Sequence, residues 1–258
     1  MGDRRKIAVV GATGRVGHHL VEILTAGGHE VVPISRSGGV DVITREGLAD
    51  ALTGVSVVID AATGPSPEQE AATEFFETAA RNLQEEGERA GVEQIIAVSI
   101  IGTDRFTHGY GAAKIAHERA TLAGPVPGLV VRASQFHELV GQMVEWGTQG
   151  DVTYVQRMRT QLVAARTVAE GLAALATGSE SAPAPAASGF PEIAGPREES
   201  LVDAATLLTA RRGDRVNIEA VSDPADPDSR LYESGALLPG PGATLAGPTF
   251  EEWLASNA

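Results

Sequence analysis

One seven-residue stretch, GATGRVG (residues 11–17), limits what this chain can fold into more than any other feature. It directly follows an apolar run, KIAVV (6–10), and it opens an amphipathic stretch, RVGHHLVEILTAG (15–27). A glycine-rich turn between a buried strand and a helix can bind the pyrophosphate of a dinucleotide, because the helix N-terminus presents N–H groups and partial positive charge. The context therefore predicts a dinucleotide-binding α/β fold, and the alternative is a tight turn that holds no ligand.

The glycines of this loop have separate expected roles. Gly11 permits the tight turn, Gly14 lets a pyrophosphate approach the backbone, and Gly17 lets the helix pack closely on the strand. Their spacing is G-x-x-G-x-x-G, which differs from the G-x-G-x-x-G pattern. The loop residues that we expect to bind the cofactor are Gly11, Thr13, Gly14, Arg15, Val16 and Gly17.

Beyond the loop, apolar runs alternate with amphipathic stretches, which is the pattern of βαβ units around a buried parallel sheet. Strands are expected at 30–35, 55–62, 93–102, 128–133, 151–156, 159–165 and 216–221. Helices are expected at 44–54, 67–91, 135–147, 166–177 and 200–213, with a short one in PTFEEWLASN near the end. Pro33 suggests that the second strand lies at an edge of the sheet or ends irregularly. SESAPAPAASG (179–189) is interpreted as a surface loop, with a linker as the alternative.

The fold class that follows is α/β, a Rossmann-type doubly wound parallel sheet with a small C-terminal substrate-binding region. Residues 1–150 are expected to form the dinucleotide-binding Rossmann core. Residues 151–258 are expected to hold the remaining Rossmann elements, interlaced with a small substrate-binding lobe. In this region the alternation of strands and helices weakens.

The amino-acid composition limits the classes of binding partner that we expect. A net charge of −14 argues against nucleic acid or an anionic membrane, and no apolar run approaches the roughly 20 residues that span a bilayer. The chain has no cysteine, which excludes disulfides and thiolate metal sites, and no His/Asp/Glu spacing indicates a metal. MGDRRKIAVVGATG is too short and too soon glycine-rich for a signal peptide. We expect a cytoplasmic monomer or homodimer with a small-molecule substrate.

The end of the second expected strand decides which dinucleotide is preferred. An NAD site usually places an acidic residue there, whereas an arginine can hold the 2′-phosphate of NADP. Here the chain reads Ser35-Arg36-Ser37, and the next acidic residue is Asp41. Arg36 can pair with a phosphate through two hydrogen bonds, both serines add hydroxyl donors, and Arg15 can add a second cation. We predict NADP(H) bound at Ser35, Arg36, Ser37 and Asp41, and the alternative for Arg36 is a solvated loop charge.

A Tyr-x-x-x-Lys pair in GYGAAKIAHERA (109–120) is the candidate for catalysis. The chain has three Tyr and only two Lys against eighteen Arg, so this spacing seldom arises by chance. Tyr110 and Lys114 would share a helix face, where a neighbouring cation favours the ionised phenol and lowers its pKa. Such a phenol can pass a proton to a carbonyl oxygen as hydride reaches the carbon. The alternative is two ordinary residues on a surface helix.

Several motifs together carry a family resemblance: GATGRVG, SRS, DAATG (60–64), SIIG (99–102), YGAAK (110–114) and VRASQFHE (131–138). Over residues 6–138 the chain resembles an atypical short-chain dehydrogenase/reductase of the NmrA-like, NAD(P)-binding kind. The resemblance implies that Ala61, Ala62 and Thr63 line the cofactor. It also implies that Ser99 closes the active site beside Tyr110 and Lys114, with Lys114 also holding the nicotinamide ribose.

The segment after residue 133 is expected to contact substrate. Its candidates are Gln135, Phe136, His137 and Met143, although helical spacing suits a core stripe equally well. Three functions stay open at this point. The first is an NADPH-dependent reductase acting on a carbonyl, enone or quinone of a small organic molecule. The second is a non-catalytic NADP(H)-binding redox sensor, and the third is a redox-neutral isomerase or epimerase.

Overall fold

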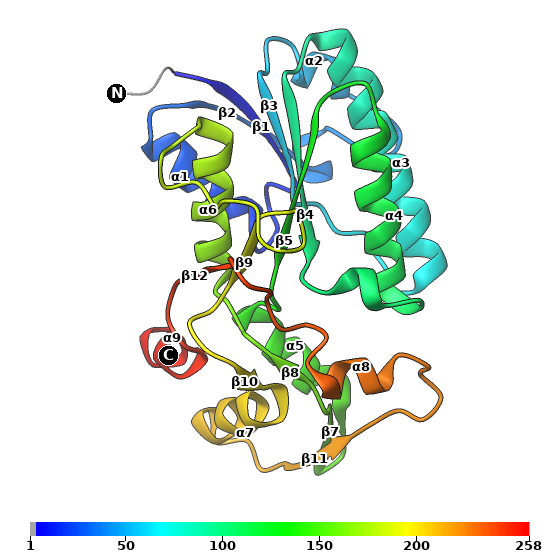
Figure 1. The fold of residues 1–258 in the computed structure, drawn as a ribbon, viewed down its shortest axis with the longest axis vertical. Coiled ribbons are helices and arrows are strands. Elements are labelled where there is room, and N and C mark those ends of the chain that lie inside the picture. Colours follow the sequence, from blue (N-terminus) through cyan, green and yellow to red (C-terminus); the bar gives the residue numbers. More distant parts are fainter. Residues whose placement is uncertain (1–3, 258) are drawn as a thin grey trace.

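The structure is a computed structural model that describes residues 4–257, so the outermost residues of the two predicted regions lie outside it. A seven-stranded sheet has the order β12-β9-β5-β4-β3-β1-β2, and its paired strands run parallel (Figure 1). Its strands are β1 (Lys6–Val10), β2 (Glu30–Ile34), β3 (Val57–Asp60), β4 (Gln94–Ile100), β5 (Gly128–Ala133), β9 (Glu192–Ala194) and β12 (Thr244–Leu245). The predicted α/β fold class is confirmed.

Helices cover both faces of this sheet. On one face α1 (Gly17–Ala26) packs against α6 (Ala165–Thr177), and on the other lie α2 (Leu48–Ala51), α3 (Gln69–Ala90) and α4 (Gly109–Ala123) (Figure 1). Successive residues of β1 point to opposite faces. Ile7 and Val9 join the core under α1 and α6, whereas Ala8 and Val10 join the core toward α2 and α3. Burial on both faces explains why β1 is uninterruptedly apolar.

A second, smaller group of elements lies below the carboxyl ends of the main strands (Figure 1). It contains a three-stranded sheet, β11-β7-β6, and a two-stranded pair, β10-β8. Its strands are β6 (Thr148–Gln149), β7 (Val152–Gln156), β8 (Arg159–Thr160), β10 (Glu199–Ser200) and β11 (Asn217–Val221). Its helices are α5 (His137–Gly147), α7 (Leu201–Arg212), α8 (Ser229–Ser234) and α9 (Phe250–Ser256). A separate apolar core, centred on Val140, Leu208 and Phe250, holds this group together.

Local backbone conformation explains where the elements differ from expectation. The helix predicted at 44–54 is reduced to α2, because Arg45 and Gly47 both adopt φ of 67° in the left-handed region. The strand predicted at 159–165 stops at Thr160, and the chain then continues extended with a single bridge between Phe136 and Val163. The edge position that Pro33 suggested is confirmed, since β2 ends the main sheet.

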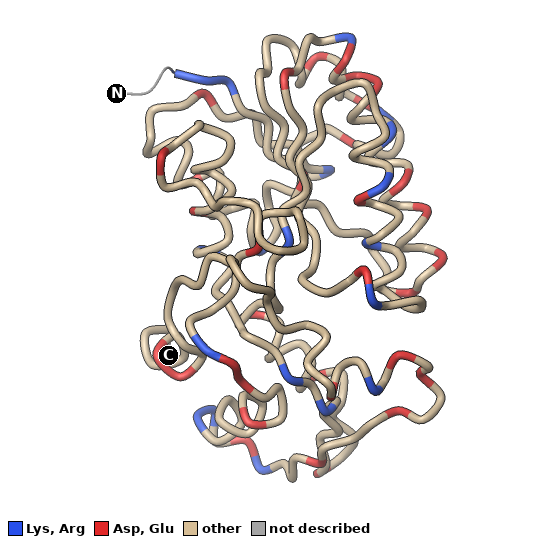
Figure 2. The backbone as a smooth tube through the Cα atoms, in the orientation of Figure 1, with Lys and Arg blue, Asp and Glu red and all other residues tan. Residues whose placement is uncertain are grey.

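The charge distribution is uneven over the surface. Acidic residues recur along the outer side of α3, as the red segments in Figure 2 show. Glu70, Glu74 and Glu77 belong to this exposed side, which contributes to the net charge of −14. None of the helices between residues 4 and 257 is long and apolar enough to cross a membrane.

Candidate cofactor and catalytic site

The glycine loop lies where the strand order reverses. Strand β1 has β2 on one side and β3 on the other, and ligands of open α/β sheets bind outside the carboxyl ends of the strands at such a point. The loop is fixed there because the N–H groups of Gly11 and Ala12 donate to the carbonyl of Ile34, at 3.0 and 3.2 Å. The end of β2 is thereby held against the loop.

The three loop glycines meet different neighbours. A Cβ on Gly11 would lie 2.8 Å from Cα of Ala62, and Gly11 has φ of 74°. A Cβ on Gly17 would overlap the carbonyl of Gly11, so both positions are required by the protein's own packing. A Cβ on Gly14 would meet only that same carbonyl, at 3.1 Å. The exposed backbone at Gly14 is therefore open to a ligand, as a pyrophosphate needs.

The start of α1 suits an anion. Its N-cap, Val16, offers no capping side chain, and the first turn holds no acidic residue. Thr13, Gly14 and Arg15 are exposed, whereas Val16 is buried in the core and can present only its backbone. These features fit the phosphates of a dinucleotide, which would take hydrogen bonds from the uncapped N–H groups.

The residues after β2 form a short turn. The Ser35 hydroxyl accepts from the Gly38 N–H at 3.2 Å, and it lies 3.2 Å from the Ser37 hydroxyl. Arg36 is exposed, and within residues 4–257 its guanidinium makes no ion pair. Asp41 instead caps the following turn, because its Oδ1 accepts from the Ile43 N–H at 2.7 Å. Arg36 thus remains available to an anion, whereas Asp41 is engaged with its own backbone.

Arg15 and the segment after β3 flank the loop on its other side. Arg15 donates to Oε1 of Gln142 on α5 at 2.7 Å, so its guanidinium lies against the smaller group of elements. Ala61 donates its N–H to the carbonyl of Val10 at 3.1 Å, and Ala61 and Ala62 lie beside Gly11. That Ala61, Ala62 and Thr63 line the cofactor stays a prediction.

Tyr110 lies in the first turn of α4 and is half-buried against Phe76, with ring centroids 5.8 Å apart. Its hydroxyl makes no hydrogen bond to any described residue. Burial and the charge of Asp60 raise the pKa of Tyr110 to about 12. The prediction that a neighbouring cation lowers this pKa is wrong, because burial and the carboxylate of Asp60 both raise it.

Lys114 lies one turn further along α4 and is only 5% exposed. Its Nζ donates to the carbonyl of Val98 at 2.7 Å and lies 2.8 Å from Nδ1 of His117. The other ring nitrogen of His117 lies 3.0 Å from Oδ2 of Asp60. Burial lowers the pKa of Lys114 to about 8, although the charges of Asp60 and Glu118 oppose this. The lysine is therefore part of a buried polar chain and is not a surface charge.

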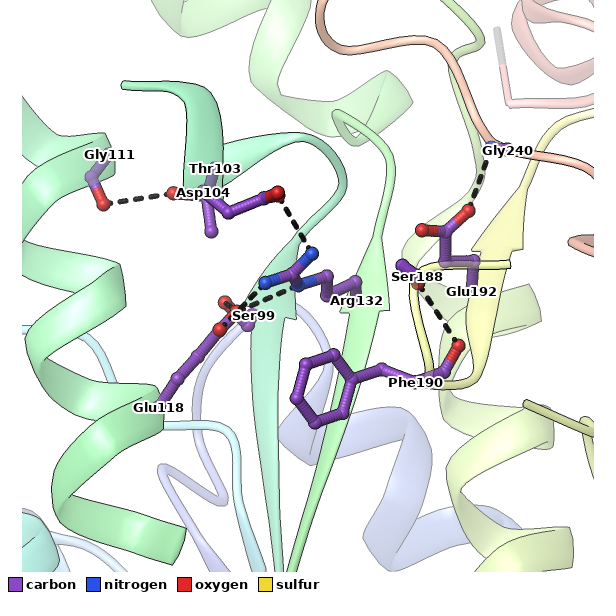
Figure 3. A network of polar contacts seen from close by, with 10 residues as sticks. All are labelled: Ser99, Thr103, Asp104, Gly111, Glu118, Arg132, Ser188, Phe190, Glu192 and Gly240. Atoms are coloured by element: carbon purple, nitrogen blue, oxygen red, sulfur yellow. Dashed lines mark hydrogen bonds and ion pairs between the residues drawn. The ribbon is translucent and has the colours of Figure 1, made fainter. Parts of the chain in front are cut away.

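Ser99 belongs to a second buried network (Figure 3). Its hydroxyl donates to Oε1 of Glu118 at 2.6 Å, and Arg132 donates to both oxygens of Glu118, at 2.9 and 2.8 Å. Arg132 also pairs with Asp104 at 2.8 Å and lies over the ring of Phe190. The structure thus joins Ser99 to Glu118, and no hydrogen bond links it to Tyr110 within the described chain.

The four candidate substrate contacts are not brought together on one surface. Gln135 accepts a hydrogen bond from Thr160, and Phe136 packs against the core under α1 and α6. His137 is 1% exposed, with Nε2 at 3.1 Å from the carbonyl of Pro248, and burial lowers the pKa of His137 to about 4. Met143 packs into the core of the smaller group. Met143 therefore behaves as part of the core stripe that helical spacing also allowed, and His137 is buried as well.

Sequence reasoning missed Asp60, Phe76, His117, Glu118 and Arg132. Lys-x-x-His in AKIAH is a signal that was present, because residues i and i+3 share a helix face. Asp60 ends the fully buried strand β3, and a carboxylate at such a point needs a partner. The pairing of Glu118 with Arg132 joins α4 to β5, and periodicity does not reveal such a contact.

The fold and the loop at its reversal point define an α/β protein that binds a dinucleotide. The chain belongs to the NAD(P)H-binding family, whose model matches residues 11–177. No curated protein is significantly similar to the chain. The narrower NmrA-like assignment and NADP specificity stay predictions.

Solved structures share the fold at low sequence identity. MoeE5 in complex with UDP-glucose and NAD is 19% identical with a TM-score of 0.69, and the match covers 98% of this chain and 99% of that one. The dTDP-4-dehydrorhamnose reductase of Bacillus anthracis, in complex with NADP, is 16% identical with a TM-score of 0.71 and 98% coverage of both chains. The UDP-N-acetylglucosamine 4-epimerase of Bacillus cereus is 16% identical with a TM-score of 0.65, covering 98% and 94%.

Proposed function

We propose that the protein is an NADPH-dependent reductase that reduces a carbonyl, enone or quinone group of a small organic molecule. One observation carries the proposal. Tyr110 and Lys114 lie one turn apart on α4, and Lys114 is bonded to the carbonyl of Val98, near the carboxyl end of β4. Strand β4 neighbours β3 at the reversal point, so the pair belongs to the same end of the sheet as the glycine loop.

The chemistry of the chain's own residues supports the reductive direction. A bound nicotinamide dinucleotide supplies the hydride. Tyr110 is protonated at neutral pH and can donate its proton to a substrate oxygen, although its pKa, raised to about 12, makes it a weaker acid than an ordinary phenol. Lys114 supplies a positive charge that stabilises the developing oxyanion. Ser99 already donates to Glu118, so proton donation is assigned to Tyr110, and Ser99 keeps acceptor capacity only.

The preference for NADPH over NADH is assigned to Arg36. Its guanidinium is exposed at the carboxyl end of β2, with the hydroxyls of Ser35 and Ser37 beside it. An arginine there fits a 2′-phosphate. Asp41, the nearest acidic residue, is already engaged with the backbone of Ile43.

The experiment is NADPH oxidation with a panel of quinones, enones, ketones and a keto-sugar nucleotide, followed by loss of NADPH absorbance. Tyr110→Phe should bind NADPH like the wild type but lose about 10²–10⁴-fold in turnover, the usual contribution of a general acid. Tyr154→Phe is the matched control, since Tyr154 is 37% exposed on β7 and should leave the rate unchanged. NADPH binding without oxidation across the panel, or an unaffected Tyr110→Phe rate, contradicts the proposal.

A further inference from the structure

A buried polar chain runs from β3 to α4 beneath Tyr110. Oδ2 of Asp60 lies 3.0 Å from Nε2 of His117, and Nδ1 of the same ring lies 2.8 Å from Nζ of Lys114. The exposed fractions are 2%, 1% and 5% in that order. Three titratable side chains thus meet in a row with almost no contact with water, and only Lys114 is used by the proposed reaction.

With Asp60 ionised and Lys114 protonated, as the lowered pKa of Asp60 and the pKa of about 8 of Lys114 give at neutral pH, the contacts fix where the protons lie. A carboxylate only accepts hydrogen bonds and an ammonium only donates them. His117 must therefore carry its hydrogen on Nε2, donate it to Asp60, and accept from Lys114 at Nδ1. The ring is then neutral, and the charges of Asp60 and Lys114 balance across it. A neutral imidazole agrees with the pKa of His117, which burial and the charge of Lys114 lower.

Further contacts surround the row of Asp60, His117 and Lys114. Phe76, from α3, stacks on the ring of His117 at 4.7 Å and lies 4.1 Å from Nζ of Lys114. The second oxygen of Asp60 accepts the N–H of Ala62 at 3.1 Å. The other charged or titratable groups that act on the row are Glu118, which is paired with Arg132, and Tyr110. One N–H of the Lys114 ammonium is left without a partner among the described residues.

We propose that His117, held in one tautomer by Asp60, is a positioning residue that fixes the Lys114 ammonium and keeps it charged within the site. The unit formed by Asp60, His117 and Lys114 aims two of the three N–H bonds of the ammonium into the protein. The third N–H is left for a ligand at the site. The catalytic role of this unit rests on the proposed function. The pKa of Lys114 and the tautomer of His117 can nevertheless be measured without turnover.

The experiment uses NMR of the full chain, with and without NADP⁺. The chain contains only two lysines, so a lysine side-chain label gives two signals, and Lys6, paired with Glu30 at the surface, is the internal reference. Replacing Asp60 by Asn removes the counter-charge and should lower the pKa of Lys114 by about one unit or more. The titration of Lys6 should stay unchanged. An unchanged Lys114 titration overturns the proposal.

A second readout needs no variant. Ring-nitrogen shifts of His117 in the wild-type chain should show a neutral ring with hydrogen on Nε2 through the neutral pH range. A ring with hydrogen on Nδ1, or one that titrates like an exposed histidine, overturns the proposal. His117→Asn, which keeps an acceptor near the Nδ1 position but cannot reach Asp60, should shift Lys114 in the same direction as Asp60→Asn.

Measurements of NADPH oxidation distinguish a failure of this inference from a failure of the proposed function. If NADPH is oxidised, the basic limb of the pH–rate profile should move down with Asp60→Asn by the shift seen in NMR. If NADPH is never oxidised while both NMR results hold, the reductase assignment fails and the unit stands. If NADPH is oxidised but the Lys114 titration is unchanged in Asp60→Asn, or His117 carries its hydrogen on Nδ1 or titrates like an exposed histidine, only the proposal for the unit fails.

Discussion

The replacement of Glu118 by Gln is a sharp test of how the site is held together. Glu118 is 5% exposed and accepts three hydrogen bonds, one from Ser99 and two from Arg132, which is 4% exposed. Removing one partner of a buried ion pair leaves an uncompensated charge and costs about 3–5 kcal/mol. Because Gln keeps the volume and one acceptor oxygen, we expect a loss near the lower end of that range. This corresponds to a fall in Tm of about 6–12 °C.

The chain offers a matched control with the same geometry at the surface. Arg159 donates to both oxygens of Glu198, at 2.6 and 3.0 Å, with side chains that are 49% and 46% exposed. Exposed ion pairs contribute little to stability because water screens them, so Glu198→Gln should barely alter the free energy of unfolding. Free energies of unfolding from urea titrations of both variants measure the contrast. Equal losses for the two variants would refute the argument that burial decides the cost.

A paired replacement separates the ion pair from its packing. Glu118→Leu combined with Arg132→Met removes both charges and keeps apolar volume, so it should cost less than Glu118→Gln alone. In the double variant the hydroxyl of Ser99 loses its acceptor, and this unsatisfied hydrogen bond lowers the free energy of unfolding. A double variant that is less stable than the single one would show that the pair stabilises the fold beyond its mutual compensation.

Three further outcomes are expected. Gly14→Ala should leave Tm within a few degrees but weaken dinucleotide binding in a fluorescence titration, whereas Gly17→Ala should cost about 1–3 kcal/mol through overpacking. Arg36→Ala should weaken NADPH binding about 10- to 100-fold, because a hydrogen bond to a charged group contributes about 1.5–3 kcal/mol, and it should leave NADH binding unchanged; equal losses for both would contradict the 2′-phosphate assignment. Burial raises the pKa of Tyr110 and of Tyr232 to about 12, above the unfolded value of 10.0, so their contribution to stability is complete below pH 10 and is lost between pH 10 and 12. In Tyr110→Phe, the free energy of unfolding should therefore fall less steeply between pH 10 and 12, as measured by denaturant titrations at a series of pH values. An unchanged slope would contradict the burial of this phenol.

The main sheet and the glycine loop could be predicted from the sequence because their signals are local. An apolar run such as β1 and the turn that follows it depend on residues close in the chain. The two-residue strand β12 could not be predicted, since so short a segment has no period. The full helix expected at 44–54 does not form, because Arg45 has a left-handed φ. Its side chain contacts Asn82 and Glu86 on α3, which are distant in the sequence.

The candidate catalytic region shows a different limit of sequence reasoning. Charged residues on a helix are ordinarily interpreted as its solvated face. In α4 the buried positions include Lys114, His117, Glu118 and Thr121, so the inward face of this helix is largely polar. The Tyr-x-x-x-Lys spacing identified the helix and the pair, but the partners of that face come from distant strands and have no local signature.

Those partners explain how a polar face can be buried at all. The negative charge of Asp60, on β3, compensates the positive charge of Lys114 through His117. The positive charge of Arg132, on β5, compensates the negative charge of Glu118. The pair of Asp60 with Lys114 and the pair of Glu118 with Arg132 are each neutral, so α4 can pack on the sheet without leaving a buried charge unpaired. Hydrophobic area alone would let the helix slide by a turn, whereas two charge-matched contacts on strands either side of β4 allow one register. The position of Tyr110 at the head of α4 is therefore set by the buried charges that follow it along the helix.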